Sequence, residues 1–174
     1  MKIEPEQLDV LRTYLASIYD ACEKASAAGV SATVNGERLN LRQLFEIETT
    51  AYLMYLSASD NVIEEDEVAF INSLMSRTYS LDDCVKFIES SQMSAEEFLS
   101  QPPVSFKLLA AYGGADYADA MDALISFYDV LGMALSEVDD NLALPERNAY
   151  KSFVYMLRGY KALNEPQQDE RRTF

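Results

Sequence analysis

A run of acidic residues between Asp60 and Glu67 is the stretch of this sequence whose residue types could do chemistry. It holds five carboxylates in eight residues, and the sequence has no Lys or Arg from Gln43 to Ser76. Carboxylate oxygens that converge on one point bind Mg²⁺ or Ca²⁺, and without His or Cys ligands they favour these ions over zinc. An acidic surface can also dock a basic protein partner. A third interpretation needs no ligand, because acidic side chains stabilise a helix N-terminus by roughly 0.3–1 kcal/mol each.

The spacing within the run narrows the metal hypothesis. An EF-hand loop requires a central Gly and oxygen ligands at alternate positions, whereas Val62 and Ile63 occupy interior positions here and the Gly is missing. We therefore exclude an EF-hand. A looser site could combine Asp60 with Glu64 or Glu67, since residues three and four apart lie on one face of a helix.

The same run also predicts an ordinary helix start. Asn61 is a favoured N-cap residue, and Glu64 follows it at the spacing of a capping box. This interpretation accounts for most of the charges without any ligand. The core face of the helix would then consist of Val68, Ile71, Leu74 and Met75.

The elements that must position these carboxylates are helices. Apolar residues recur at three- and four-residue steps from Leu8 to Cys22, which predicts an amphipathic helix. A second helix is expected over Leu41–Ser59, and the uncharged sequence TTAYLMYLSAS at its end indicates burial on most sides. Between the two helices, the turn dipeptide Asn35-Gly36 is compatible with a small hairpin. We expect a structured loop there instead.

Further helix signals follow towards the C-terminus. Ser80 and Ser94 are candidate N-caps, and a Pro-Pro pair at 102–103 precedes a short apolar helix. Long amphipathic helices are expected from Tyr117 and from near Pro145. The polar segment 165–174 is expected to fray. The chain is thus predicted to be a single all-α domain, a bundle of about seven to eight helices.

Composition argues against several functional classes. The chain has 174 residues and a net charge of −15, which makes nucleic acid and anionic membranes poor partners. It contains no histidine, so the usual general base and the commonest zinc ligand are missing, and we expect no enzymatic activity. Cys22 and Cys84 fit buried, reduced thiols of a cytoplasmic protein. Uncharged runs are too short to span a bilayer, so no membrane insertion is expected.

The helix–turn–helix pattern around the acidic run occurs a second time. LSASDNVIEEDEVAFI begins at Leu56, and LSEVDDNLALPERNAYKSF begins at Leu135, about eighty residues later. Both stretches begin with Leu-Ser, contain Asp-Asn a few residues later and continue into an amphipathic helix. The second turn has one extra residue, and Arg147 replaces an acid. The repetition predicts an internal duplication with a pseudo-twofold arrangement.

The run YLMYLSASDNVIEEDEVAFI resembles the signature of the TerB-like superfamily, in which an apolar helix is followed by Asp-Gly-x-Ile-x-x-x-Glu and a second helix. Asp60, Ile63 and Glu67 match this spacing. Asn61 stands where the family has Gly, and Asn tolerates the left-handed backbone that such a turn requires.

The resemblance implies a compact helical bundle rather than a reaction. It covers residues 41–75 and, more loosely, 117–163. Members are associated with tellurite resistance and stress-response systems or with co-chaperones. The resemblance also implies a divalent metal, Ca²⁺ or Mg²⁺, held by acidic residues at the two turns. The corresponding residues are Asp60, Glu64, Glu67, Asp139, Asp140 and Glu146.

Three functions remain open. The first is a non-enzymatic binding or scaffold protein of a stress-response or secretion-linked assembly. The second is an immunity or chaperone-like protein that binds a basic toxin or export substrate. The third is a divalent-metal-binding regulatory protein. In the first two, the partner is a protein with a basic surface, and the residues expected to contact it are Glu64, Glu65, Asp66 and Glu67.

Overall fold

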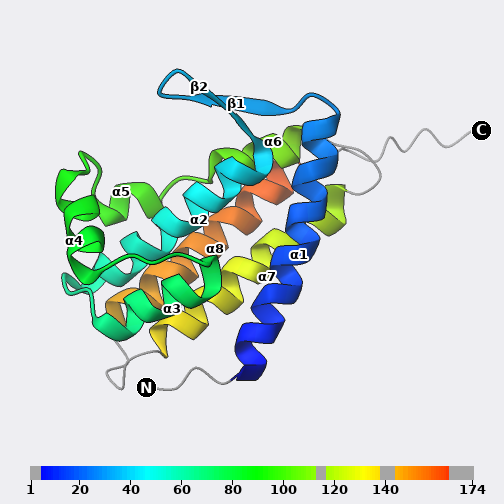
Figure 1. The fold of residues 1–174 in the computed structure, drawn as a ribbon. Helices are drawn as coiled ribbons and strands as arrows, with labels where there is room; N and C mark the ends of the chain where they lie inside the picture. Colours follow the sequence, from blue (N-terminus) through cyan, green and yellow to red (C-terminus); the bar gives the residue numbers. More distant parts are fainter. Residues whose placement is uncertain (1–4, 113–116, 138–143, 165–174) are drawn as a thin grey trace, which may run out of the picture.

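Helix α2 (Leu41–Ser57) is the central element of the fold. In the computed structural model, which describes residues 5–112, 117–137 and 144–164, every other described α-helix contacts α2 (Figure 1). All side chains from Thr49 to Ser57 are buried. The burial predicted from the uncharged sequence of this stretch is therefore confirmed.

The remaining elements follow one another with short connections, and the helical fold class is confirmed. Helix α1 (Pro5–Ala27) precedes a two-stranded hairpin of β1 (Ser31–Val34) and β2 (Glu37–Asn40). After α2 come η1 (Ala58–Asp60), α3 (Glu65–Met75), α4 (Leu81–Ser90), α5 (Ala95–Leu99), α6 (Val104–Tyr112), α7 (Tyr117–Ser136) and α8 (Leu144–Asn164). The predicted fraying of 165–174 lies outside the described residues.

The segment between α1 and α2 is a hairpin, and the prediction of a loop is wrong. Strands β1 and β2 pair antiparallel, with Val34 opposite Glu37. Asn35 and Gly36 have φ values of 51° and 85°, the left-handed conformations that a tight two-residue hairpin turn requires. The strands are only four residues long and partly exposed, so they lack the alternating apolar pattern that would have identified them.

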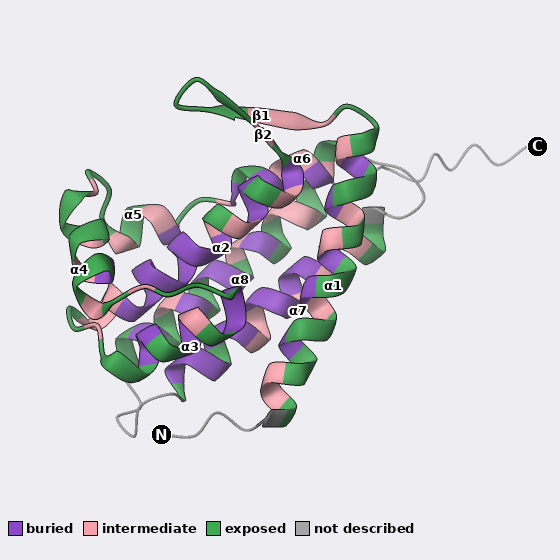
Figure 2. Cartoon of the chain, in the orientation of Figure 1, coloured by how far each residue is buried: buried purple, intermediate pink, exposed green. Residues whose placement is uncertain are grey.

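Aromatic side chains fill the centre of the bundle. The ring of Tyr52 lies 4.9 Å from that of Tyr128 and 4.7 Å from that of Phe153, measured between centroids. Tyr128 and Phe153 are themselves 5.3 Å apart, so α2, α7 and α8 meet in one aromatic cluster, a geometry that adds to area burial. Buried residues line the inward faces of these helices (Figure 2). Tyr52 and Tyr128 are thus fully buried in the core.

Helices α7 and α8 approach each other closely at Gly132. A Cβ atom at this position would lie 2.5 Å from Cβ and Cγ of Tyr150. Only glycine therefore permits this separation of the two helices. Helix α1 packs along the other side of α7. Within the described ranges, no helix is both long and apolar enough to cross a bilayer.

A long-range carboxylate contact fixes the start of α6. Glu48 on α2 accepts hydrogen bonds from the backbone N–H groups of Val104 and Ser105, at 2.5 and 2.8 Å. The first N–H groups of a helix lack intrahelical partners, and a carboxylate there satisfies them and opposes the helix dipole. Glu48 thus joins α2 to α6.

Candidate functional site

The bend after α2 is closed by two residues of the acidic run. An oxygen of Asp60 (Oδ1) accepts a hydrogen bond from the backbone N–H of Val62 at 2.9 Å. Asn61 adopts the left-handed conformation, with φ of 73°. The expectation that Asn61 accommodates a left-handed turn is confirmed.

Asn61 is not the N-cap of α3, contrary to the prediction. Glu64 is the N-cap, with extended backbone, and α3 begins at Glu65. The Oε2 atom of Glu67 accepts a hydrogen bond from the Glu64 backbone N–H at 2.8 Å. Capping-box geometry is therefore present, but it starts three residues later than expected because Asn61 belongs to the preceding bend.

The four acids at the start of α3 divide into two groups. Glu64, Glu65 and Asp66 are exposed, whereas the Glu67 side chain is only 2% exposed. The prediction that Glu67 belongs to the docking surface is therefore wrong. The helical period explains this: Glu67 precedes Ile71 by four residues and Leu74 by seven, so it lies on the core face.

Glu67 meets Glu146 from the first turn of α8. Glu146 is 3% exposed, and its carboxyl group lies close enough to that of Glu67 to influence the pKa of Glu67. Two carboxyl groups can form a hydrogen bond with each other only if one of them carries a proton. Glu146 also lies on the core face of its helix, four residues before Tyr150 and seven before Phe153. The two hairpins thus place a glutamate at the same helical position, and the two residues lie together.

The surroundings of Glu67 favour its protonated form. Burial raises the pKa of Glu67 to about 7, and the negative charge of Asp60 acts in the same direction. The hydrogen bond with the Glu64 backbone opposes the rise, as do the Ser57 hydroxyl and the carboxyl group of Glu146. That hydroxyl is buried and forms no hydrogen bond of normal geometry. Near neutral pH the pair therefore carries less than its full negative charge.

The residues expected to bind a metal are only partly brought together. Asp60 and Glu64 are at least partly exposed, at the bend and the helix start, while Glu67 pairs with Glu146. Asp139 and Asp140 lie outside the described residues. Within the described part of the chain, no group of three or more His, Cys, Asp or Glu side chains is placed to hold a metal ion.

The outward-facing acids continue onto α4 and α5. We call residues 58–101 the acidic end of the molecule; α3, α4 and α5 lie together on one side of the bundle (Figure 1). This segment contains ten acidic and two basic residues, so its net charge is −8 out of −15 for the chain. Its exposed acids are Glu64, Glu65, Asp66, Asp82, Asp83, Glu89, Glu96 and Glu97.

The two basic residues of the acidic end lie beside acids of α2 and α4. Arg77 lies 3.6 Å from Glu46 of α2, and Lys86 lies 2.5 Å from Asp82. Basic residues gather on α8 instead, where Arg158 pairs with Asp129 at 3.1 Å and Lys161 pairs with Asp122 of α7 at 2.6 Å. The acidic end thus presents an excess of negative charge to solvent.

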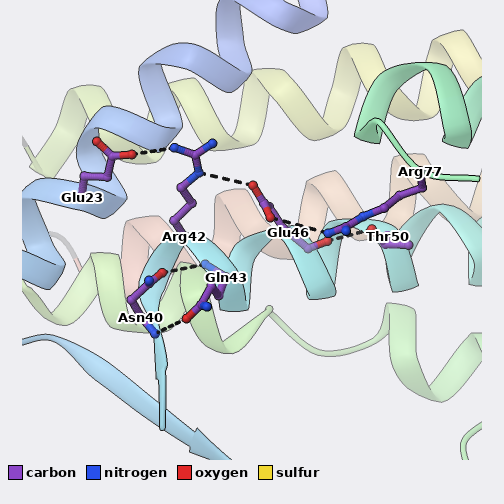
Figure 3. Close-up of polar contacts among 7 residues, drawn as sticks. All are labelled: Glu23, Asn40, Arg42, Gln43, Glu46, Thr50 and Arg77. Carbon is purple, nitrogen blue, oxygen red and sulfur yellow. Dashed lines mark hydrogen bonds and ion pairs between the residues drawn. The ribbon is translucent and has the colours of Figure 1, made fainter.

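A second charged cluster, which the sequence did not indicate, lies at the α1–α2 interface. Arg42 is paired with Glu23 at 2.6 Å and with Glu46 at 3.3 Å, and Arg77 approaches Glu46 from the chain after α3 (Figure 3). The Arg42 guanidinium also stacks over the ring of Tyr19, 4.1 Å from its centroid. Opposite charges alternate across three segments here, so the cluster joins α1, α2 and the end of α3.

The cysteines do not have the properties of nucleophiles. Both thiols are buried and unpaired. Burial raises the pKa of Cys22 to about 12, and it raises the pKa of Cys84 as well. A nucleophilic cysteine needs a lowered pKa so that thiolate is present at neutral pH. Both residues are core thiols instead.

A hollow of about 550 Å³ lies between η1, α5 and the start of α8. Small side chains provide most of its walls, including Ala58, Ser59, Ala95, Ala149 and Ser152. It has the size of a ligand site, which typically spans about 300–1,000 Å³. The hollow lies where the first bend contacts α8.

Comparison with protein-family models, curated proteins and solved structures gives no match for this chain.

Proposed function

We propose that this chain is a non-enzymatic binding or scaffold protein of TerB-like fold, which docks a basic protein on its acidic end. The observation that carries the proposal is the division of the acidic run. Three carboxylates at the start of α3 face solvent, and further exposed acids lie on α4 and α5, which are helices on the same side of the bundle. The fourth α3 acid, Glu67, is buried and lies beside Glu146, so it is not part of this surface.

Electrostatics explains why such a surface selects a partner. A concentrated negative potential accelerates encounter with a basic protein and disfavours acidic competitors. Arg77, Arg158 and Lys161 lie beside acids of α2 and α7. A role in a stress-response or secretion-linked assembly follows from the TerB-like resemblance and forms part of the proposal.

Charge reversal tests the proposal. The triple variant Glu64→Lys, Glu65→Lys and Asp66→Lys should lose a discrete protein that the wild-type chain recovers from a native lysate. The matched control reverses three exposed acids on other elements, Glu6, Glu37 and Asp119, and changes the net charge equally. Recovery that is lost equally in both variants would show a general charge effect and contradict a docking surface on α3.

An immunity or chaperone-like protein would use the same surface. In that case the recovered partner is a basic toxin or export substrate encoded by a neighbouring gene. A partner from a tellurite-type operon would support the scaffold role instead. Identifying the recovered protein by mass spectrometry distinguishes the two.

A divalent cation is the alternative that the resemblance favours. The described residues supply a carboxyl pair rather than a ligand set, so we derive no role for a metal. Calorimetry with Ca²⁺, Mg²⁺ and Zn²⁺ tests this alternative. A saturable heat that is lost in Asp60→Ala would support it, and the absence of any saturable heat would end it.

A further inference from the structure

The hollow between η1, α5 and α8 has walls that could accommodate a long side chain of another protein. Its lining combines a short apolar floor, which includes Leu99 and Ala149, with the hydroxyl and amide groups of Ser94, Asn148 and Ser152. Among the described residues, no lining side chain is large enough to fill a space of about 550 Å³. An arginine or lysine side chain has a matching character, since its stem packs on apolar surface while its head remains hydrated.

A carboxylate lies on the wall of the hollow. Glu96 is the only ionisable residue among the described residues that line it. Two of its three walls, η1 and α5, belong to the acidic end, whose net charge is −8. Arg147 and Lys151 of α8 are next to the lining residues Asn148 and Ser152 in the sequence, but they do not line the hollow. A cation that enters the hollow therefore meets the Glu96 carboxylate.

Two exposed apolar residues flank the hollow along α8. Leu144 is 70% exposed and Tyr155 is 80% exposed. Their positions are four residues before Asn148 and three after Ser152, so all four lie along one stripe of the helix. Exposed aromatic and aliphatic groups beside a cavity provide contact area around an anchoring side chain.

We propose that this hollow receives an arginine or lysine side chain from a basic segment of the docked partner, with Glu96 as the residue that holds the charged head. The inference rests on the proposed function and specifies where on the acidic end the partner is anchored. The side chain's stem packs on Leu99 and Ala149, while the neighbouring exposed acids attract the rest of the segment.

A defined peptide tests the inference without the natural partner. The probe is a helical peptide of about 16 residues, in an Ala/Gln host, with arginine at every fourth position. Its control replaces each arginine by citrulline, which keeps the shape and removes the charge. Affinity is measured by calorimetry at low ionic strength, where charge contacts are least screened. We expect the citrulline peptide to bind more than about tenfold more weakly.

Adjacent glutamates provide the matched variants. Glu96 and Glu97 are both exposed on α5, but only Glu96 lines the hollow. Glu96→Gln should weaken binding of the arginine peptide about three- to tenfold, and Glu97→Gln by less than about twofold. Ser152→Trp fills the hollow and should abolish binding, whereas Ser73→Trp on exposed α3 surface should not. If Ser152→Trp fails to fold, the comparison of Glu96→Gln with Glu97→Gln still tests the inference.

Several results would overturn the inference. These are equal affinities in Glu96→Gln and Glu97→Gln, unchanged binding to a folded Ser152→Trp variant, or no binding of the arginine peptide by the wild-type chain. If any of these occurs while the triple reversal on α3 still loses its lysate partner, the docking proposal stands and the hollow is not its anchor. If the triple reversal has no effect on that partner, the proposed function itself fails.

Discussion

The hairpin of α2 and α3 turns through polar contacts, whereas α7 and α8 are held by close packing. In the first hairpin, Asp60 and Asn61 shape the bend, and Glu67 caps the start of α3 from inside. In the second, the glycine at position 132 lets α8 lie directly against α7. The two hairpins meet through Glu67 and Glu146. The comparison shows that removal of polar groups should damage the first hairpin and addition of volume should damage the second.

The largest effect is expected from Glu67→Ala. The change removes the acceptor of the Glu64 N–H group and the partner of Glu146, both in the interior. We expect the free energy of unfolding to fall by about 3 kcal/mol. Chemical denaturation measures it, with Glu65→Ala as the exposed control, expected within about 0.5 kcal/mol of wild type. Equal losses in the two variants would contradict an inward role for Glu67.

The pH dependence of stability also tests whether Glu67 is buried. The pKa of Glu67 is about 7 in the folded chain and near 4.5 when unperturbed. Between these values the folded state holds a proton that the unfolded state has lost, so stability decreases as pH rises. Through Glu67, the free energy of unfolding should fall by on the order of 2–3 kcal/mol between pH 4.5 and pH 7. Glu67→Gln should flatten that part of the stability curve, and an unchanged curve would refute the assignment.

Added volume tests the second hairpin. Gly132→Ala forces a Cβ atom against Tyr150 and should cost about 2 kcal/mol, even though Ala favours a helix over Gly by about 1 kcal/mol. The control is Gly159→Ala on α8, where a Cβ atom would meet nothing within 4 Å. That variant should be neutral or slightly stabilised. Thermal melts compare the two variants. A melting temperature of Gly132→Ala no lower than that of the control would contradict close packing at this position.

A smaller effect is expected at the contact between Glu48 of α2 and the start of α6. Glu48→Gln keeps the shape of the side chain but loses the charge that faces two backbone N–H groups. We expect a loss of about 1 kcal/mol, and a larger one for Glu48→Ala. Hydrogen exchange at the Val104 and Ser105 amides reads the contact directly. Unchanged protection at these two amides in Glu48→Ala would show that the contact does not hold α6.

The smallest effect belongs to the Arg42 cluster. Its pairs are partly exposed and therefore screened by solvent and salt. Arg42→Met should lower the melting temperature slightly at low salt, and the difference should shrink in about 1 M salt. A difference that persists at high salt would assign the effect to the Tyr19 contact rather than to charge.

Helical periodicity predicted most of the fold. Core positions such as Ile71, Leu74 and Phe153 recur at helical spacing, and each of them is buried. The same periodicity contained the signal for Glu67 and Glu146, because both continue the apolar face of their helices. Residue type points the other way, because carboxylate side chains are rarely buried unless they are paired.

Other features depend on tertiary contacts that no local pattern encodes. The pairing of Glu67 with Glu146 requires two segments about eighty residues apart to meet. Arg42 sits between acids of two different helices, and neither neighbour could be identified from its own sequence context. The hollow beside α5 likewise forms from three separate segments.

The acids at the start of α3 are divided between two environments: three of them face outward, and Glu67 faces Glu146. Both the docking surface and the buried pair depend on this division. Carboxyl-detected NMR titration of the labelled chain measures this division directly. We predict a glutamate signal that titrates near pH 7, disappears in Glu67→Gln and shifts in Glu146→Gln. Titration of Glu67 near its ordinary pKa of about 4.5, unaffected by Glu146→Gln, would contradict this division.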